Sequence, residues 1–330
     1  MRSTLAVFGV SALVLGSLFA CGDDPTSDDP GAGSSSGATS SGASGSSGAA
    51  SSSGASGGGS SSGVGGDGGR DGASGDGAVG EECGIAAPGL GFVGAQTLDV
   101  GGASRGYQLF LPPGYDQRQR YPVILVFHGD GGSGAGVRAS FDIEGASGGA
   151  AIVAYPNGQG GTWQIDNYAA LMKDVAFVDA LATELTASYC GDGRVFLAGF
   201  SKGAYFVNQA ACRTSVTLTG IASHSGGGPY GTRASEYDAA GKTVCPSPPV
   251  AAMQLHGNPD SNVPLSEGVT SRDYWRAANA CAAGTAGVSP APCVAYNGCA
   301  RSEIWCAIPG IGHSVWSSAP TAIWDFFRAL

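Results

Sequence analysis

The chain has 330 residues and an uneven composition, with 58 glycines and only 13% charged residues, against about 25% charged residues in an average protein. The net charge is −10, and the 19 acidic and 14 basic residues from Glu81 onward argue against a protein that binds duplex nucleic acid. Residues 22–80 alone hold 20 glycines and 17 serines, which leaves about 250 residues for one folded domain.

The N-terminus has the layout of a secretory signal: a basic dipeptide precedes an apolar run from Leu5 to Ala20, and Cys21 follows. The tetrapeptide at 18–21 is similar to a bacterial lipobox, whose cysteine is acylated, although Phe19 is bulkier than usual at its position. The alternative is an ordinary cleaved signal with an incidental cysteine. We expect residues 1–21 to be a lipoprotein-type signal, and the protein to be extracellular or held at the cell surface through a lipid anchor at Cys21.

Residues 22–80 contain almost no apolar side chain larger than alanine. Such a segment cannot bury enough surface to offset the entropy lost on ordering, so the composition predicts a disordered Gly/Ser-rich linker. A flexible chain of this length has a root-mean-square reach of about 40 Å. The folded domain is expected to span residues 81–330.

From residue 81 onward, short apolar runs alternate with helical patterns, which is typical of an α/β domain with a mostly parallel sheet and helices on both faces. Strands are expected at 96–100, 107–111, 123–127, 152–155, 195–198, 220–223, 251–256 and 304–308. Helices are expected from Asp174, from Ser201 to about Cys212, near 266–280 and at the C-terminus.

The sequence Gly199-Phe200-Ser201-Lys202-Gly203 is a G-x-S-x-G motif directly between a predicted strand and a predicted helix. A serine on such a tight turn is exposed as a nucleophile, and small flanking residues allow the strand and the helix to approach each other. The same letters would mean little in the glycine-rich linker. Their position here predicts that Ser201 is a catalytic nucleophile rather than a structural serine.

A nucleophilic serine needs a base, and the chain offers four histidines, at 128, 224, 256 and 313. In this arrangement the order along the chain is serine, acid, histidine. His128 precedes the serine, and His224 follows it by only 23 residues. His256 begins a loop whose sequence favours presenting Asp260 instead. His313, on a glycine-lined loop after a predicted strand, is the expected base.

The third residue of a Ser–His–acid triad is expected between Ser201 and His313. Six acidic residues lie in that stretch: Glu236, Asp238, Asp260, Glu267, Asp273 and Glu303. Asp260 falls in the loop directly after a predicted strand, where the ligand chemistry of open α/β sheets gathers. The alternative for Asp260 is a purely structural capping role in its loop. Asp260 is expected to orient and stabilise the protonated base.

Two backbone amides are expected to form an oxyanion hole. One belongs to Lys202, directly after the nucleophile, and the other to the turn at Gly129–Gly131, where the amide of Asp130 is the expected donor. Each such donor typically contributes about 3 kcal/mol to stabilisation of the transition state.

The chain has nine cysteines, and eight remain when Cys21 is set aside. In an oxidising compartment these eight can form up to four disulfides. A turn is expected to close one pair, a second pair to link the ends of the two helices that flank the strand before Ser201, and a third to join the last helices and strand. The two cysteines left over are expected to fasten the N-terminal arm. The expected pairs are Cys293–Cys299, Cys190–Cys212, Cys281–Cys306 and Cys83–Cys245.

Together these motifs resemble the secreted feruloyl esterases of the α/β-hydrolase fold and, more distantly, the extracellular polyhydroxybutyrate depolymerases and acetylxylan esterases. The resemblance covers nearly all of 83–330 and rests on Cys83-Gly84, Tyr107–Pro112, Gly114-Tyr115-Asp116, His128-Gly129, Tyr155–Gly158, Trp163, Asp174–Asp179, 199–203, His256-Gly257, Asp260, Gly312-His313, Cys281, Cys293–Cys299 and Trp305-Cys306. The sequence departs from the family at Lys202, at Ala204 in place of a second glycine and at Ile311, where glycine is more common.

The resemblance implies a serine esterase that acts on ester-linked groups of plant cell-wall polysaccharide such as xylan, with Trp163 beside the substrate or, equally well, anchoring a long loop. Polyhydroxybutyrate depolymerase and acetylxylan esterase are alternative activities. A further alternative is a non-catalytic module that binds polysaccharide or a partner protein. No zinc spacing, phosphate loop or dinucleotide motif occurs, so neither a metal nor another cofactor is expected. The expected partner is a carbohydrate-linked or polymeric ester.

Overall fold

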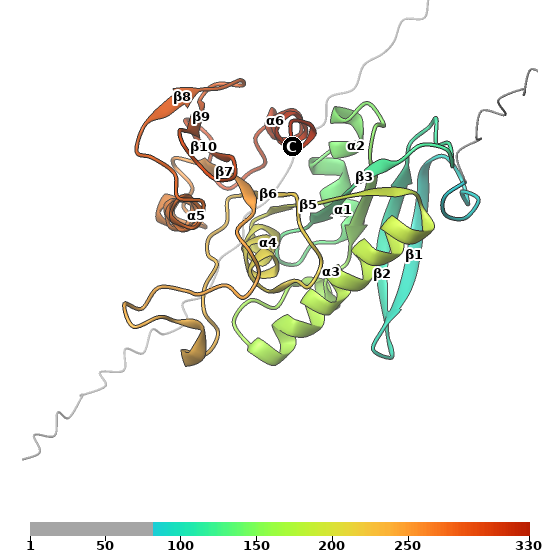
Figure 1. Cartoon of the computed structure of the whole chain (residues 1–330), viewed down its shortest axis with the longest axis horizontal. Helices are drawn as coiled ribbons and strands as arrows, with labels where there is room; N and C mark the ends of the chain where they lie inside the picture. The colour runs from blue at the N-terminus through green and yellow to red at the C-terminus, as the bar shows by residue number, and fades with distance from the viewer. Residues whose placement is uncertain (1–81) are drawn as a thin grey trace, which may run out of the picture. The chain divides into compact units, whose positions relative to one another are not determined.

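The computed structural model describes residues 82–330 (Figure 1). The predicted signal at 1–21, its Cys21 and the linker at 22–80 lie outside the described residues. None of the helices in the described range is long and apolar enough to cross a membrane.

A ten-stranded sheet forms the centre of the domain, in the order β1-β2-β4-β3-β5-β6-β7-β10-β9-β8. The pairs from β4 through β3, β5, β6 and β7 to β10 are parallel, and strands at both edges pair antiparallel. The strands are β1 (Gly91–Val100), β2 (Ala103–Leu111), β3 (Tyr121–Phe127), β4 (Ile152–Pro156), β5 (Gly191–Phe200), β6 (Gly220–His224), β7 (Ala251–Gly257), β8 (Thr285–Gly287), β9 (Cys293–Tyr296) and β10 (Glu303–Ile308). The mostly parallel α/β-hydrolase arrangement predicted from the sequence is therefore confirmed.

Helices cover both faces of the sheet and enclose two apolar cores. The helices α3, α4 and α5 contribute to one core, whereas α1, α2 and α6 contribute to the other; Figure 1 shows α3 running across one face. Their bounds are α1 (Gly134–Ser140), α2 (Ile143–Ala146), α3 (Tyr168–Ser188), α4 (Lys202–Arg213), α5 (Leu265–Ala278) and α6 (Ala319–Arg328). Strands β3, β4 and β7 are buried along their whole length, as expected for strands covered on both faces.

Helix α3 begins six residues before the expected start at Asp174. The side chain of Asn167 accepts a hydrogen bond from the Ala170 amide and so caps the true N-terminus. Asp174 does not cap the helix. It lies within α3 with its side chain buried, and its carboxylate accepts a hydrogen bond from Arg105 on β2 at 2.8 Å. The sequence analysis also missed α1, α2, β8 and β9, which are short elements with weak apolar patterns.

All eight expected disulfide cysteines are paired, but none of the four predicted pairings is correct. The structure joins Cys83–Cys190, Cys212–Cys245, Cys281–Cys299 and Cys293–Cys306, in place of Cys293–Cys299, Cys190–Cys212, Cys281–Cys306 and Cys83–Cys245.

The reason for the first two corrections is that Cys190 and Cys212 belong to different neighbourhoods of the sheet. The carbonyl of Cys190 accepts from the amide of Tyr121 at the start of β3, whereas that of Cys212 accepts from Ser247 in the segment between β6 and β7. Strands β3 and β6 lie on opposite sides of β5. Each cysteine therefore pairs with the segment that packs on its own side.

The other two corrections follow from an unrecognised hairpin. Strand β9 pairs antiparallel with β10, and Cys293 stands directly opposite Cys306. Cys281 and Cys299 meet where the chain leaves α5, because the amide of Ala282 donates to the carbonyl of Asn297 in the next segment.

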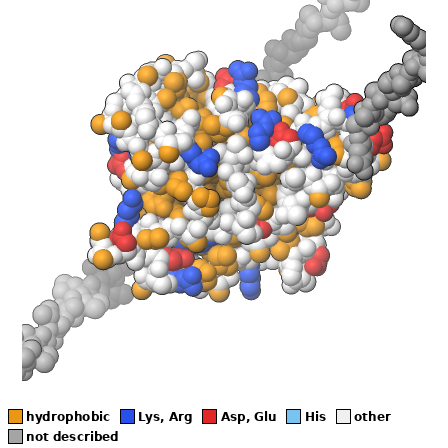
Figure 2. All heavy atoms as spheres, viewed as in Figure 1, with side chains coloured by type: hydrophobic (Ala, Val, Ile, Leu, Met, Phe, Trp, Pro, Cys, Tyr) orange, Lys and Arg blue, Asp and Glu red, His pale blue; other side chains and the backbone are white. Residues whose placement is uncertain are grey.

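The face of the domain seen in Figure 2 carries scattered lysine, arginine and acidic side chains among apolar and uncharged ones. No broad patch of one charge sign dominates that view.

Candidate active site

The parallel strands bring the candidate residues to one edge of the sheet. Ser201 follows the carboxyl end of β5, Asp260 lies just beyond β7, and His313 lies beyond β10. Residues separated by 112 positions in the chain thereby become direct neighbours. This is the edge at which ligands of open α/β sheets bind.

Ser201 adopts a strained backbone conformation, with φ of 55° and ψ of −124°. The chain is held there by close packing: a Cβ on Gly199 would lie 2.5 Å from the Gly203 carbonyl oxygen, and one on Gly203 would lie 2.3 Å from that of Phe127. The amide of Ser201 also donates to the carbonyl of His224 on the neighbouring strand at 2.9 Å. The two motif glycines are therefore required by contact, and the serine hydroxyl is held out from the turn.

Ser201, His313 and Asp260 form a continuous chain of hydrogen bonds. His313 Nε2 lies 2.8 Å from Ser201 Oγ, and His313 Nδ1 lies 2.8 Å from Asp260 Oδ2. The side chain of Asp260 is fully shielded from solvent, whereas that of His313 keeps 16% of its surface exposed. The imidazole is thus accessible from solvent, whereas the carboxylate is not.

Asp260 is held in its charged form. Burial by itself would raise the pKa of its carboxyl, but hydrogen bonds from the Val263 and Asn262 amides and from His313 outweigh burial and lower the pKa. The two amides donate to Oδ1 at 2.9 and 3.0 Å. They leave Oδ2 for His313, so the anion is available to stabilise an imidazolium.

The other three histidines are buried and bound to backbone groups. His128 and His224 each accept a backbone amide at Nε2, from Gly158 and Trp316 respectively, and His256 Nε2 donates to the Val263 carbonyl. Burial lowers the pKa of all three, to about 3 for His224, where His256 and His313 nearby lower it further. The elimination made from sequence order thus agrees with the geometry.

His224 has a positioning role that the sequence did not reveal. Its carbonyl accepts from the Ser201 amide, and its ring accepts from the amide of Trp316, three residues after His313. One residue at the end of β6 therefore connects the nucleophile's turn to the loop that carries the base. Its position at a strand end was visible in the sequence, but its partners were not.

The turn after β3 lies against the nucleophile, as expected for the second half of an oxyanion hole. A Cβ on Gly129 would lie 3.3 Å from that of Ser201, and the amide of Gly132 donates to the Gly129 carbonyl to close the turn. The amide of Lys202 is in the first turn of α4 and has no acceptor within the helix. The Lys202 and Asp130 amides remain our candidates for the oxyanion donors.

A second loop, residues 157–164, braces this turn with three hydrogen bonds. Gly158 donates to His128 Nε2 at 2.9 Å, the Trp163 indole donates to the His128 carbonyl at 3.0 Å, and the Thr162 hydroxyl donates to the Asp130 carboxylate. Because Nε2 accepts, the proton of the His128 ring resides on Nδ1, which donates to the Gly129 carbonyl.

The brace is itself anchored to the buried ion pair between Arg105 and Asp174. Asp174 accepts from the amide of Gln164 at 2.9 Å, and Arg105 approaches the Asn157 carbonyl at 3.5 Å. Both charged side chains are 3% exposed. The sequence analysis placed Asp174 in a helix but missed this function.

The predicted contact between Trp163 and substrate is wrong. The Trp163 side chain is fully buried, with 0% exposure, and stacks on Phe206 at 4.9 Å between ring centroids. An indole without accessible surface cannot hold an acyl group or a sugar. Trp163 instead anchors the loop and supports the oxyanion turn through His128.

We expect Trp163→Phe to lower kcat about tenfold with little change in KM. The substitution removes one buried hydrogen bond, to the His128 carbonyl, and loosens the turn that carries the candidate oxyanion amide. Because that amide acts only in the transition state, a loss of about 1.4 kcal/mol lowers kcat and leaves substrate binding unchanged. Steady-state kinetics on p-nitrophenyl butyrate measure both constants. Trp275→Phe is the matched control, since its buried indole donates instead to Asn208. Equal kinetic losses in the two variants would contradict a specific role for Trp163.

Two of the other acids considered for the triad, Glu236 and Glu303, are buried in surroundings of their own. Glu236 accepts from Arg213 at 2.8 Å; burial would raise the pKa of its carboxyl, but Arg213 and Thr232 lower it to about 2. Glu303 is 1% exposed, and neither of its carboxyl oxygens has a hydrogen-bond partner among residues 82–330. Within the same residues, the side-chain hydrogen bonds of His313 go to Asp260 and Ser201 and not to Glu236 or Glu303.

Burial raises the pKa of Glu303 well above its usual value, against weaker attraction from Arg276 and Arg272. Because the folded protein favours the neutral carboxyl, the wild type is most stable below about pH 4.5, the ordinary pKa of a glutamate, and loses stability as the pH rises from there to the raised pKa. Glutamine does not ionise. Between those two pH values, we therefore expect the free energy of unfolding of Glu303→Gln to rise relative to wild type by about 1.4 kcal/mol per pH unit. Urea unfolding at about pH 5 and about pH 7 measures it, with the half-exposed Glu184→Gln as control. A pH-independent difference would contradict the raised pKa.

Comparisons with known proteins find similarity to esterases. Residues 164–290 match the family described as Phospholipase/Carboxylesterase. Feruloyl esterase C of Emericella nidulans is 29% identical over 246 residues, which cover 68% of this chain and 84% of that protein. The chain is an esterase with the α/β-hydrolase fold. Feruloyl esterase D of Neurospora crassa is 26% identical over 259 residues, covering 70% of this chain and 84% of that protein. The resemblance to the feruloyl esterases is confirmed.

Solved structures share the fold of this esterase at low sequence identity. An acetyl xylan esterase from Aspergillus awamori has a TM-score of 0.55 and 17% identity, covering 71% of this chain and 99% of that chain. A feruloyl esterase module from Clostridium thermocellum, solved with sinapinate, has a TM-score of 0.50 and 14% identity, covering 71% of this chain and 85% of that chain.

Proposed function

We propose that this carbohydrate esterase releases ester-linked acyl groups, feruloyl groups first among them, from plant cell-wall polysaccharide through an acyl-enzyme on Ser201. The observation that supports the mechanism is the hydrogen-bonded chain from Ser201 Oγ through His313 to Asp260, with both distances 2.8 Å. The substrate class is supported by the feruloyl esterase relatives.

In the first half of the reaction Ser201 Oγ attacks the ester carbonyl carbon while its proton passes to His313 Nε2. The charge that develops on the imidazole is stabilised by the buried Asp260 carboxylate at Nδ1. The carbonyl oxygen becomes an oxyanion, which the amides of Lys202 and Asp130 stabilise. Collapse of this tetrahedral intermediate breaks the ester bond, and His313 returns the proton to the departing sugar hydroxyl.

In the second half a water molecule takes the position of the leaving alcohol. His313 removes a proton from this water as it attacks the acyl-enzyme carbonyl, and the same amides stabilise the second oxyanion. Collapse releases the carboxylic acid and returns the proton to Ser201 Oγ. The enzyme is restored without a metal or a redox step.

A panel of methyl ferulate, acetylated xylan and polyhydroxybutyrate tests the acyl preference. We expect the highest kcat/KM on methyl ferulate, and Ser201→Ala provides the background rate on each substrate. Faster release of acetate from xylan, or of hydroxybutyrate from the polyester, would replace the feruloyl assignment by the corresponding alternative.

A non-catalytic binding module is the competing hypothesis, and p-nitrophenyl butyrate separates it from an enzyme. We expect a burst of p-nitrophenol proportional to enzyme concentration if acylation is faster than deacylation, and steady turnover in either case. Folded protein that releases no p-nitrophenol above the Ser201→Ala background would favour the binding module.

The N-terminal sequence supports secretion with attachment at Cys21. We expect the wild-type protein in the membrane fraction and Cys21→Ser in soluble fractions, because an acyl anchor holds a protein at a bilayer. Detergent-free fractionation and mass spectrometry of the mature N-terminus measure the outcome. A soluble wild-type protein that begins after another cleavage point would contradict lipidation.

A further inference from the structure

A cavity of about 490 Å³ opens at the edge of the sheet opposite the triad. Its wall includes Tyr121 and Pro122 at the start of β3 and Arg194 near the start of β5. Ser201 follows the other end of β5. Since a strand rises about 3.3 Å per residue, the seven residues from 194 to 201 separate the two sites by about 20 Å.

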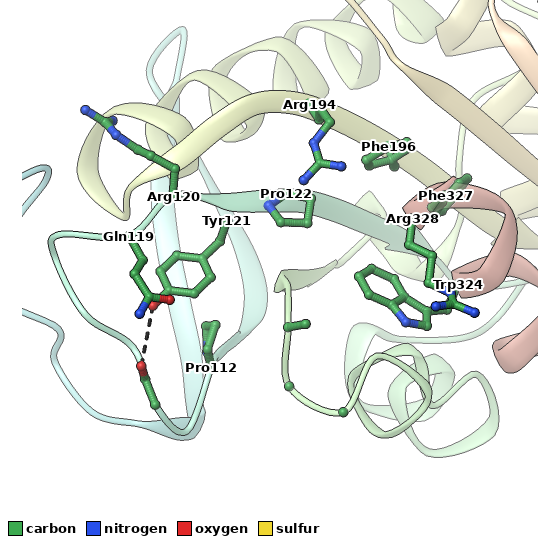
Figure 3. Close-up of a pocket in the computed structure, with 14 residues that line it drawn as sticks. Pro112, Gln119, Arg120, Tyr121, Pro122, Arg194, Phe196, Trp324, Phe327 and Arg328 are labelled. Carbon is green, nitrogen blue, oxygen red and sulfur yellow. Dashed lines mark hydrogen bonds between the residues drawn. The ribbon is translucent and has the colours of Figure 1, made fainter. Parts of the chain in front are cut away.

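The cavity combines an aromatic ring with arginines (Figure 3). Trp324 and Arg328 are four residues apart on α6 and therefore lie on the same face of that helix. Figure 3 shows the Arg194 guanidinium reaching from β5 toward the same space, whereas Arg120 points away from it. Phe196 and Phe327, whose rings stack at 4.5 Å, are buried beneath the cavity and support its floor.

Among the described residues, the charged side chains that line the cavity are three arginines, at 120, 194 and 328. Two of them are paired with acids outside the lining: Asp192 accepts from Arg194 Nε and Nη2, and Asp325 accepts from Arg328 Nε. Among the hydrogen bonds of residues 82–330, one terminal nitrogen of Arg194 and both terminal nitrogens of Arg328 have no protein acceptor. The acids thus hold the guanidinium groups in place and leave donors for an anion.

This lining suits a ring that is apolar on one face and carries a carboxylate at its edge. An indole packs against the C–H face of a sugar ring, and the planar fork of an arginine matches a carboxylate. The folded domain carries more acidic than basic residues, 19 against 14 from Glu81 onward, whereas the charged residues described in the lining of this cavity are arginines. We propose that the cavity binds a uronate unit of an acidic polysaccharide.

The consequence is a second attachment point on the same chain. A polymer held at the Trp324 cavity stays near the enzyme while esters on other parts of the polymer reach Ser201. Holding two partners together raises their effective concentration without altering the catalytic site. The binding step does not depend on the proposed acyl preference, because it involves no residue of the triad.

The test measures binding of a tri-galacturonate to the full chain by calorimetry, with a neutral xylo-oligosaccharide as the comparison ligand. We expect saturable binding of the galacturonate alone, weakened by added salt. Arg328→Gln should weaken it about tenfold, and Trp324→Ala by at least as much. Arg301→Gln, which removes one exposed charge elsewhere, is the matched control and should change nothing.

Turnover of p-nitrophenyl butyrate should stay unchanged in all three variants, which separates this site from the proposed function. Arg328 has a 61% exposed side chain, so its replacement does not threaten the fold even if Trp324→Ala proves unstable. No binding by wild type, equal binding by wild type and Arg328→Gln, or binding of phosphatidylglycerol vesicles without binding of galacturonate would each overturn the proposal.

Discussion

Ser201→Ala is expected to lower kcat for ester hydrolysis by about 10⁴-fold or more while leaving the thermal midpoint of unfolding close to that of wild type. The serine hydroxyl contacts His313 Nε2 at 2.8 Å, and its loss removes the nucleophile without opening a core cavity. His313→Ala should have a similar effect because no other base approaches Ser201 Oγ within the described residues. The measurements are kcat on p-nitrophenyl butyrate and thermal unfolding.

Because the three residues act as one unit, the effects should not add. The double variant Ser201→Ala/His313→Ala should be no slower than the slower single variant. Asp260→Asn should also reduce turnover strongly, since it removes the negative charge that stabilises the imidazolium. Ser314→Ala, an exposed serine beside the base, is the matched control. Full activity in Asp260→Asn would show that the acid is wrongly assigned.

Gly203→Ala is the second change with a large expected effect. The new Cβ would lie 2.3 Å from the Phe127 carbonyl oxygen and 2.5 Å from that of His128. Since both contacts are to backbone, α4 or the end of β3 has to move. We expect a loss of about 2–4 kcal/mol in the free energy of unfolding. Turnover should fall about 100-fold or more, because the movement separates the turn at 128–130 from Ser201.

Urea unfolding and kcat measure the two effects. Gly287→Ala is the control of the same chemistry, because a Cβ at that position meets nothing within 4 Å. Should Gly203→Ala match Gly287→Ala in both measurements, the close approach of helix and strand at the nucleophile would not be required.

The candidate triad could be inferred from the sequence because each member sits in a locally readable context. Ser201 lies between a β-type apolar run and a helical pattern, and Asp260 and His313 follow apolar runs of the same type. In a parallel sheet such positions meet at one edge whatever their separation along the chain. Order and local pattern were therefore sufficient to select one acid and one base.

The supporting contacts could not be inferred in this way. His224 connects Ser201 to the loop of His313, and Trp163 holds the turn after β3 through the His128 carbonyl. The local sequence around His224 is that of any histidine at a strand end, and the local sequence around Trp163 does not distinguish a buried tryptophan from one that lines a pocket. Which atoms they contact depends on segments 23 to 92 residues away.

The α/β-hydrolase arrangement, the order of the parallel strands along the chain and the even number of cysteines in the folded domain could be predicted from the sequence, because these depend on residue type and on neighbours a few positions away. The pairing of the cysteines, the side of the sheet that each loop reaches and the burial of Trp163 depend on how distant segments pack together. Cys293 pairs with Cys306 because the two strands place them opposite each other, and Cys190 pairs with Cys83 because the N-terminal arm packs along the end of α3. Such pairings follow from packing between distant segments, and spacing along the chain does not encode them.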